Sequence, residues 1–352
     1  MSDILARLSG PGAFRLWLAL LVVLHHFTRI EFGKAPVLVF FALSGFWVHR
    51  VWPARYAVTR LPYLTFIVSR WWRLAPVLLV SSAIAFTVMA GLGEADQLHA
   101  ILDQGWLQLA AATAGLGYAQ LAPLPLLPAW SLDVEMQYYL IAPLMMFAVR
   151  RLSWIVALTL AIIVQLLALM LVPETLVTSY LSFFVVGMLA AQHDWRPPRR
   201  MARAGLALAA GATVIALASP WQHVLLSEGG DGTQLFSIGL AVMMLPFALH
   251  TSLQPSDRID SLLADHSYSV YLLHWPAVLV FRHVPWEGQL QALCGAAGLF
   301  AVIALTSGLV LKTIDRPLQK RRSKWVHIRR STAPVANTAT KPKTGDIASQ
   351  FA

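Results

Sequence analysis

The sequence predicts an all-α protein that crosses a membrane several times. Of its 352 residues, 57% are hydrophobic and 12% are charged, whereas soluble domains carry about 25% charged residues. The mean hydropathy is +0.62. The apolar residues lie in long runs rather than in short alternating segments, which favours membrane-spanning helices over membrane-spanning strands. We therefore expect about ten transmembrane helices and one additional re-entrant or interfacial segment.

Ten apolar segments have lengths that suit, or nearly suit, a helix crossing a bilayer. They are residues 13–30, 36–52, 74–92, 134–149, 154–172, 176–191, 204–219, 234–251, 268–284 and 290–311. A further segment, 106–122, is interrupted by Gly115 and Gly117 and is followed by three prolines. Because these residues break a helix, we interpret it as the re-entrant or interfacial piece.

The positive charges predict how the spans are oriented. If the N-terminus lies in the cytoplasm, all of the 27 Lys and Arg residues fall on the inner side except Arg29, Lys34 and Arg282. This asymmetry is typical of an even number of spans with both termini in the cytoplasm. It also explains the net charge of +10 without nucleic acid as a partner.

The composition divides the chain near residue 318. Residues 1–317 form the predicted transmembrane domain. Residues 318–352 are basic and then rich in Thr, Ala and Pro, so we expect a disordered cytoplasmic tail held near anionic lipid.

No small-residue cleavage site follows the first apolar stretch, which indicates an uncleaved span rather than a signal peptide. The single cysteine, Cys294, excludes an internal disulfide.

Ionisable residues inside apolar segments are costly and are therefore functional candidates. Arg15 and His26 lie eleven positions apart in the first segment, close to three helical turns, so they share one face about 16 Å apart. The alternative is an interfacial role, in which Arg15 extends to the inner headgroups and His26 lies at the outer surface. His25 points about 100° away from His26, and we interpret it as structural.

The stretch "VSRWWRLAP" places Arg70 and Arg73 one turn apart at the inner end of the third span. Two arginines on one face can clamp the phosphates of a cytosolic ligand. The alternative is ordinary anchoring at the inner surface, together with the neighbouring Trp71 and Trp72.

Two later stretches carry polar residues beside apolar spans. In "PAWSLDVEMQYYLIAP", a negative charge is favoured near the start of a helix, which explains Asp133. The same effect explains Glu135 less well, and Glu135 has Tyr139 one turn further along. In "SYSVYLLHWPAVL", Tyr271 and His274 lie one turn apart, and a buried structural histidine is the alternative there. In "VLVFFALSGFW", we expect Ser44 and Gly45 to allow close helix packing.

Taken together and in order, these stretches resemble the membrane-bound acyltransferase-3 family of bacterial O-acyltransferases. The resemblance covers about residues 13–317. The lead into the Phe-Phe segment, "GKAPVLVFF", is less rich in Gly than is usual in the family, and Asp315 of "TIDRPL" stands where Glu is usual. The matching residues are Arg15 with His26, Phe40-Phe41 with Ser44-Gly45-Phe46, Arg70-x-x-Arg73 before Pro76, Trp130-Ser131-Leu132 with Glu135 and Tyr139, and Tyr271-x-x-His274-x-Pro276.

The resemblance implies a multi-pass enzyme of the bacterial inner membrane that transfers an acyl group from cytoplasmic acyl-CoA to a glycan or glycolipid hydroxyl. Acetyl-CoA is the commonest donor in the family. Exopolysaccharide, O-antigen, peptidoglycan and small glycosides all fit as acceptors. No metal-ligand spacing is present, so we expect no metal.

The resemblance also suggests roles for the site residues. Arg70 and Arg73 would hold the donor phosphates, and Arg15 would steady the thioester. His26 would act as general base or carry the acyl group covalently, with Glu135 orienting or charge-balancing it. The further polar candidates are Tyr139, Tyr271, His274 and Ser131.

Two other classes of protein have buried polar residues on many spans. A proton-coupled transporter or flippase for a lipid or glycan is the main alternative, although the two repeated halves typical of carriers are not visible in the sequence. A membrane sensor or scaffold is the other, and the short tail does not favour it.

Overall fold

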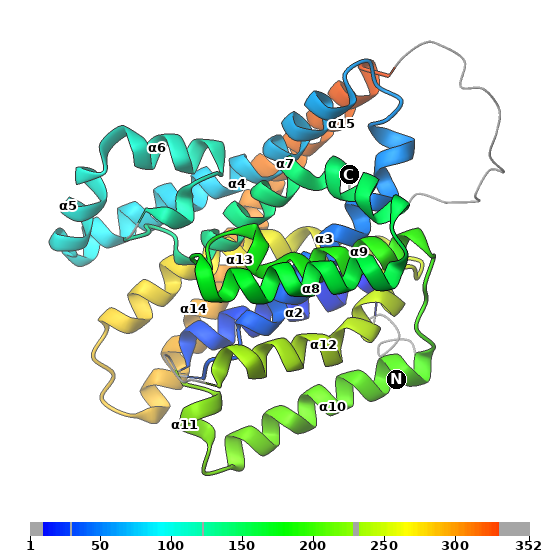
Figure 1. Ribbon diagram of the computed structural model, residues 1–352. Helices are drawn as coiled ribbons and strands as arrows, with labels where there is room; N and C mark the ends of the chain where they lie inside the picture. The colour runs from blue at the N-terminus through cyan, green and yellow to red at the C-terminus, as the bar shows by residue number, and fades with distance from the viewer. Residues whose placement is uncertain (1–9, 29, 122, 228–231, 331–352) are drawn as a thin grey trace.

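The structure is a computed structural model that describes residues 10–330, except for residues 29, 122 and 228–231. Within those residues the regular elements are helices joined by short turns, as the sequence predicts (Figure 1). The helices of four residues or more are α2 (Pro11–Phe27), α3 (Lys34–Arg55), α4 (Pro62–Leu92), α5 (Ala95–Asp103), α6 (Gly105–Ala114), α7 (Trp130–Arg151), α8 (Trp154–Leu171), η3 (Val177–Tyr180), α9 (Leu181–Gln192), α10 (Arg199–Ala218), α11 (Gln222–Leu225), α12 (Thr233–Ser252), α13 (Arg258–His283), α14 (Gln289–Val310), the π-helical turn η4 (Leu311–Asp315) and α15 (Arg316–Ile328).

Each of the ten predicted apolar segments coincides with a helix. Two of the matching helices, α2 and Val177–Gln192, are shorter apolar helices. Within the described residues, seven helices are long and apolar enough to cross a membrane: Lys34–Arg55, Pro62–Leu92, Leu127–Arg151, Trp154–Leu171, Arg199–Ala218, Thr233–Ser252 and Gln289–Ile328.

The segment predicted to be re-entrant or interfacial forms the short helix α6 and the loop after it. α6 has ten residues, about 15 Å of helix, which is too short to span a bilayer. With α5 it projects beyond the side of the bundle (Figure 1). The chain turns at Gly115 (φ 65°) and Gly117 (φ 77°), where glycine avoids the strain of a positive φ. Asp133 then holds the loop by accepting hydrogen bonds from the amides of Gly117 and Ala119, at 3.0 and 2.8 Å.

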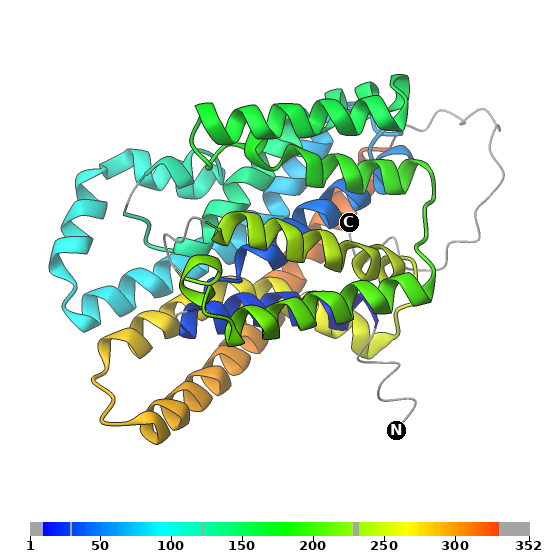
Figure 2. The same cartoon turned by 60° about the horizontal axis from the view of Figure 1, so that its bottom comes forward.

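α3 and α9 pack closely because each presents a glycine to the other. A Cβ on Gly45 would lie 2.1 Å from the carbonyl oxygen of Phe184. A Cβ on Gly187 would lie 1.8 Å from the carbonyl oxygen of Ala42. The close packing predicted for Gly45 is therefore confirmed. α10 lies on the outer side of the bundle against α12, as the view in Figure 2 shows.

α13 determines the position of α2. The carboxylate of Asp260 accepts hydrogen bonds from the Gly12 amide, at 2.9 and 3.0 Å, and from the Ala13 amide, at 2.9 Å. These amides belong to the first turn of α2, where backbone donors lack helical partners and where a negative charge is favoured. The two helices then pack along their lengths, and this contact sets the positions of Arg15 and His26.

The chain remains helical beyond residue 317, where the sequence predicts a disordered tail. α14 continues through the π-helical turn into α15, and Arg322 and Val326 are buried. The buried and half-buried residues Leu318, Arg322, Trp325 and Val326 form a stripe at helical spacing, and α15 packs against α4. The prediction of disorder is therefore wrong for residues 318–328, and residues 331–352 lie outside the described residues.

Candidate active site

A cavity lies between α2, α3, α4, α7 and α13. About 890 Å³ of space lies between its atoms, and this figure includes space open to the surroundings. Polar groups are set among apolar walls. The lining residues that carry polar side chains are Arg15, Ser44, Trp47, Arg70, Arg73, Ser131, Glu135, Tyr139, Ser267, Tyr268 and Tyr271.

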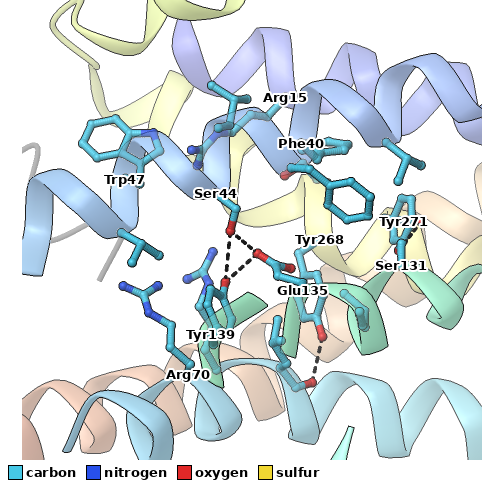
Figure 3. A pocket seen from close by; sticks show the side chains of 18 of the residues that line it. Arg15, Phe40, Ser44, Trp47, Arg70, Ser131, Glu135, Tyr139, Tyr268 and Tyr271 are labelled. Atoms are coloured by element: carbon cyan, nitrogen blue, oxygen red, sulfur yellow. Dashed lines mark hydrogen bonds between the residues drawn. The ribbon is translucent and has the colours of Figure 1, made fainter. Parts of the chain in front are cut away.

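Glu135 is the centre of the polar group in this cavity. Its Oε1 accepts hydrogen bonds from the hydroxyls of Ser44 and Tyr139, each at 2.5 Å. The two hydroxyls are themselves 3.3 Å apart. Ser44 comes from α3, and Glu135 and Tyr139 are one turn apart on α7, so this group joins two helices (Figure 3).

Two arginines approach this group from opposite sides (Figure 3). Arg70 is only 3% exposed. Its guanidinium carbon lies 5.5 Å from the ring centre of Tyr139 and 5.6 Å from that of Tyr56. The guanidinium carbon of Arg15 lies 6.0 Å from the Trp47 ring. Because buried charges require compensation, Glu135 balances positive charge that the aromatic faces only partly stabilise.

His26 lies outside the residues that line the cavity. Its ring stacks on the ring of His274, with centroids 5.2 Å apart and planes 23° apart. It also meets the edge of Trp275 at 5.4 Å and the ring of His25 at 4.5 Å. His25 instead contacts the loop after α2, where its Nδ1 lies 3.0 Å from the carbonyl oxygen of Ile30.

Tyr271 joins the cavity to the two stacked histidines. Its hydroxyl lies 2.7 Å from Ser131 Oγ and donates to the carbonyl oxygen of Pro128 at 3.2 Å. Its ring lies 6.3 Å from the His274 ring, one turn further along α13. His274 is 0% exposed, and neither of its ring nitrogens has a hydrogen-bond partner among the described residues.

The structure therefore places the predicted site residues in two adjoining groups. Most of them line the cavity, and His26 and His274 form the second group. Within the described residues, no hydrogen bond joins Glu135 to His26, although the sequence suggested that Glu135 orients the imidazole. Glu135 projects from α7 toward α3, whereas the aromatic partners of His26 come from α13 and from its own helix.

Sequence reasoning missed two features of the cavity. It assigned Ser44 to packing, whereas Ser44 donates directly to Glu135. It did not single out Tyr268, whose hydroxyl donates to the carbonyl oxygen of Leu74 at 2.7 Å and which also lines the cavity. The signal for Ser44 was available, since a hydroxyl within an apolar span faces a polar partner more readily than lipid.

A family model described as an acyltransferase domain matches residues 9–312. The chain belongs to the acyltransferase-3 family. It is a membrane acyltransferase, and the matched region contains every residue that lines the cavity, together with His26 and His274. α15 begins after that region. No curated protein and no solved structure matches this acyltransferase-3 chain.

Proposed function

We propose that the protein transfers an acyl group, most simply acetyl, from acyl-CoA to a hydroxyl of a surface or exported glycan. The donor enters from the cytoplasm and the acceptor from the opposite side of a bacterial inner membrane, with both ends of the chain in the cytoplasm. The observation that carries the proposal is the contact between Tyr271, which lines the cavity, and His274, on which His26 stacks.

The cavity suits a donor with a charged head and a long neutral arm. Arg70 and Arg73 supply positive charge suited to phosphates. Phe40, Phe41 and Leu74 supply apolar wall, which suits the pantetheine arm. Tyr271 and Ser131 contribute hydroxyls at the position closest to the histidines. A thioester held there would lie between the Arg-lined part of the cavity and the stacked imidazoles.

In the proposed reaction the acceptor oxygen attacks the thioester carbonyl carbon while the His26 imidazole takes the hydroxyl proton. A C–O bond forms and the C–S bond breaks. The proton on His26 then passes to the departing CoA thiolate, so the enzyme returns to its starting state. Arg15 can donate to the oxygen that becomes negative, and the Tyr271 hydroxyl can do so in exchange for its hydrogen bond to the Pro128 carbonyl oxygen.

The test is the release of CoA thiol by the purified protein in detergent, with acetyl-CoA offered with and without a crude glycan extract. We expect the glycan to stimulate release and His26→Ala to lower the rate by about 10²–10⁴-fold, the usual contribution of general base catalysis. His25→Gln is the matched control, because it alters the adjacent imidazole, and it should retain most of the activity.

Two results would contradict the proposal in different ways. If His26→Ala matches the wild type in turnover, His26 is not the base. If no acyl-CoA tried is bound or consumed with any glycan extract, the donor assignment fails.

A further inference from the structure

Three arginines from distant parts of the chain, Arg55, Arg70 and Arg322, lie near Tyr56, which directly follows α3, and Arg73 lies one turn after Arg70. Arg55 ends α3, Arg70 and Arg73 lie on α4, and Arg322 lies on α15. The guanidinium carbon of Arg55 is 5.9 Å from the Tyr56 ring centre, and that of Arg70 is 5.6 Å away. We call these four residues the arginine cluster.

Ser69 and Gln319 connect α15 to this cluster. The hydroxyl of Tyr56 lies 3.1 Å from Ser69 Oγ, and Arg322 Nη1 reaches the Ser69 carbonyl oxygen at 3.5 Å. Gln319 Nε2 donates to the Arg73 carbonyl oxygen at 3.3 Å. α15 therefore lies directly against the segment of α4 that carries Arg70 and Arg73.

Arg322 is only 2% exposed, and its Nε has no hydrogen-bond partner among the described residues. Within the described residues, no carboxylate lies within 4.0 Å of Arg55, Arg73 or Arg322. Asp315, on the same stretch of chain, accepts a hydrogen bond from Gln319 at 2.8 Å and interacts with Arg73 and Arg322 only at longer range.

The positive charges of the arginine cluster affect the pKa of Tyr56. Burial raises the pKa of the Tyr56 phenol, but the guanidinium groups of Arg70, Arg322 and Arg55 outweigh burial, so that its pKa lies below the ordinary value. A buried charge without a counter-ion destabilises the fold. Mutually repelling cations of this kind are stabilised when a polyvalent anion binds between them.

We propose that Arg322 is a donor-binding residue, and that α15 adds its guanidinium to Arg70 and Arg73 to hold the 3′-phosphate and diphosphate of acyl-CoA. The inference rests on the proposed function. Arg70 and Arg73 line the cavity, whereas Arg322 lies outside the lining and reaches the carbonyl oxygen of Ser69, the residue before Arg70. The nucleotide would therefore be bound where the cavity meets α15. This segment lies outside the region that the family model matches.

The experiment is calorimetric binding by the full-length protein in nanodiscs of zwitterionic lipid, with two probes. CoA carries all the phosphates, and S-acetylpantetheine carries none. The variants are Arg322→Gln, Arg322→Lys and the control Arg321→Gln, which removes the charge of the neighbouring exposed arginine. Thermal melting checks that each variant folds.

We expect Arg322→Gln to weaken CoA binding about tenfold, equivalent to about 1.4 kcal/mol, and to leave S-acetylpantetheine binding unchanged. Arg321→Gln should bind both probes like the wild type. Arg322→Lys keeps the charge but loses the planar fork, so it should weaken CoA binding less. It provides the test if Arg322→Gln fails to fold.

Three results would overturn the inference. If CoA binds the wild type and Arg322→Gln equally, the assignment of Arg322 fails while the proposed function stands. If Arg322→Gln weakens both probes alike, its role is structural. If the wild type, but not Arg322→Gln, retains anionic phospholipid that CoA does not displace, the arginine cluster binds a lipid headgroup. Failure of the wild type to bind either probe would instead count against the proposed function.

Discussion

The hydroxyl of Ser131 on α7 lies 2.7 Å from the hydroxyl of Tyr271 on α13. This pair stands where the cavity meets the stacked histidines, because the Tyr271 ring also contacts His274. A change in the Ser131–Tyr271 pair should therefore affect the reacting end of the site and leave the arginine end intact.

Replacement of Tyr271 by Phe removes the hydroxyl and keeps the ring. We expect kcat to fall about tenfold, the value of one lost hydrogen bond of about 1.4 kcal/mol, with little change in KM for acetyl-CoA. Ser131→Ala should have a smaller effect, and the double variant should be no slower than Tyr271→Phe. Steady-state kinetics of the three variants checks this. Effects that simply add would show that the two hydroxyls act independently.

Glu135→Gln keeps the shape of the side chain but removes the charge that faces Arg15 and Arg70. Because the Glu135 carboxylate interacts electrostatically with both buried arginines, we expect a clear fall in melting temperature and loss of activity. Glu287→Gln, at an exposed position, is the matched control and should melt like the wild type. Melting followed by intrinsic fluorescence in detergent makes the measurement. An unchanged melting temperature for Glu135→Gln would show that the Glu135 carboxylate does not stabilise the fold by balancing the charges of Arg15 and Arg70.

Gly187→Ala should destabilise the contact between α3 and α9. The added methyl would lie 1.8 Å from the carbonyl oxygen of Ala42, so the helices must separate, at a cost of about 1–3 kcal/mol. Gly211→Ala in α10 is the control, since a Cβ there meets nothing within 4 Å and alanine favours the helix. Thermal melting should show a loss for the first and none for the second. Equal melting would contradict the close approach.

Asp260→Asn should loosen the start of α2. The substitution removes the negative charge that faces the Gly12 and Ala13 amides, and we expect a loss of about 1–2 kcal/mol. Asp265→Asn is the comparison, because Asp265 pairs with Arg316 near the surface at 3.0 Å and such pairs contribute about 0–1 kcal/mol. Hydrogen exchange in the first turn of α2 makes the measurement. Protection that is unchanged in Asp260→Asn would contradict the cap.

The helices could be predicted from the sequence because each long apolar segment has one stable form in a bilayer, which is a helix. Glu135, Tyr139 and Tyr271 could be identified as candidates for the same reason: polar groups within apolar spans require polar surroundings. The partners of Glu135 could not be identified, because Ser44 and Glu135 are 91 positions apart and only the packing of α3 on α7 brings them together.

The same limit explains the last helix and the histidine pair. In α15 the basic residues dominate the composition, and the stripe that includes Arg322 and Val326 matters only once α4 is present to cover it. His274 lies 248 positions after His26 in the sequence. Their stacking depends on α2 lying along α13, which no local pattern encodes.

The position of α15 has a consequence for how the protein is made. α3 and α4 leave the ribosome well before α15, the helix that packs over the start of α4. Arg322 reaches Ser69, 253 positions earlier in the chain, only after α14 has been inserted. Until then Arg70 and Arg73 lack the neighbour that α15 provides. A nascent chain that stalls before residue 316 would carry all the cavity-lining residues, but it would lack the helix that lies beside Arg70 and Arg73.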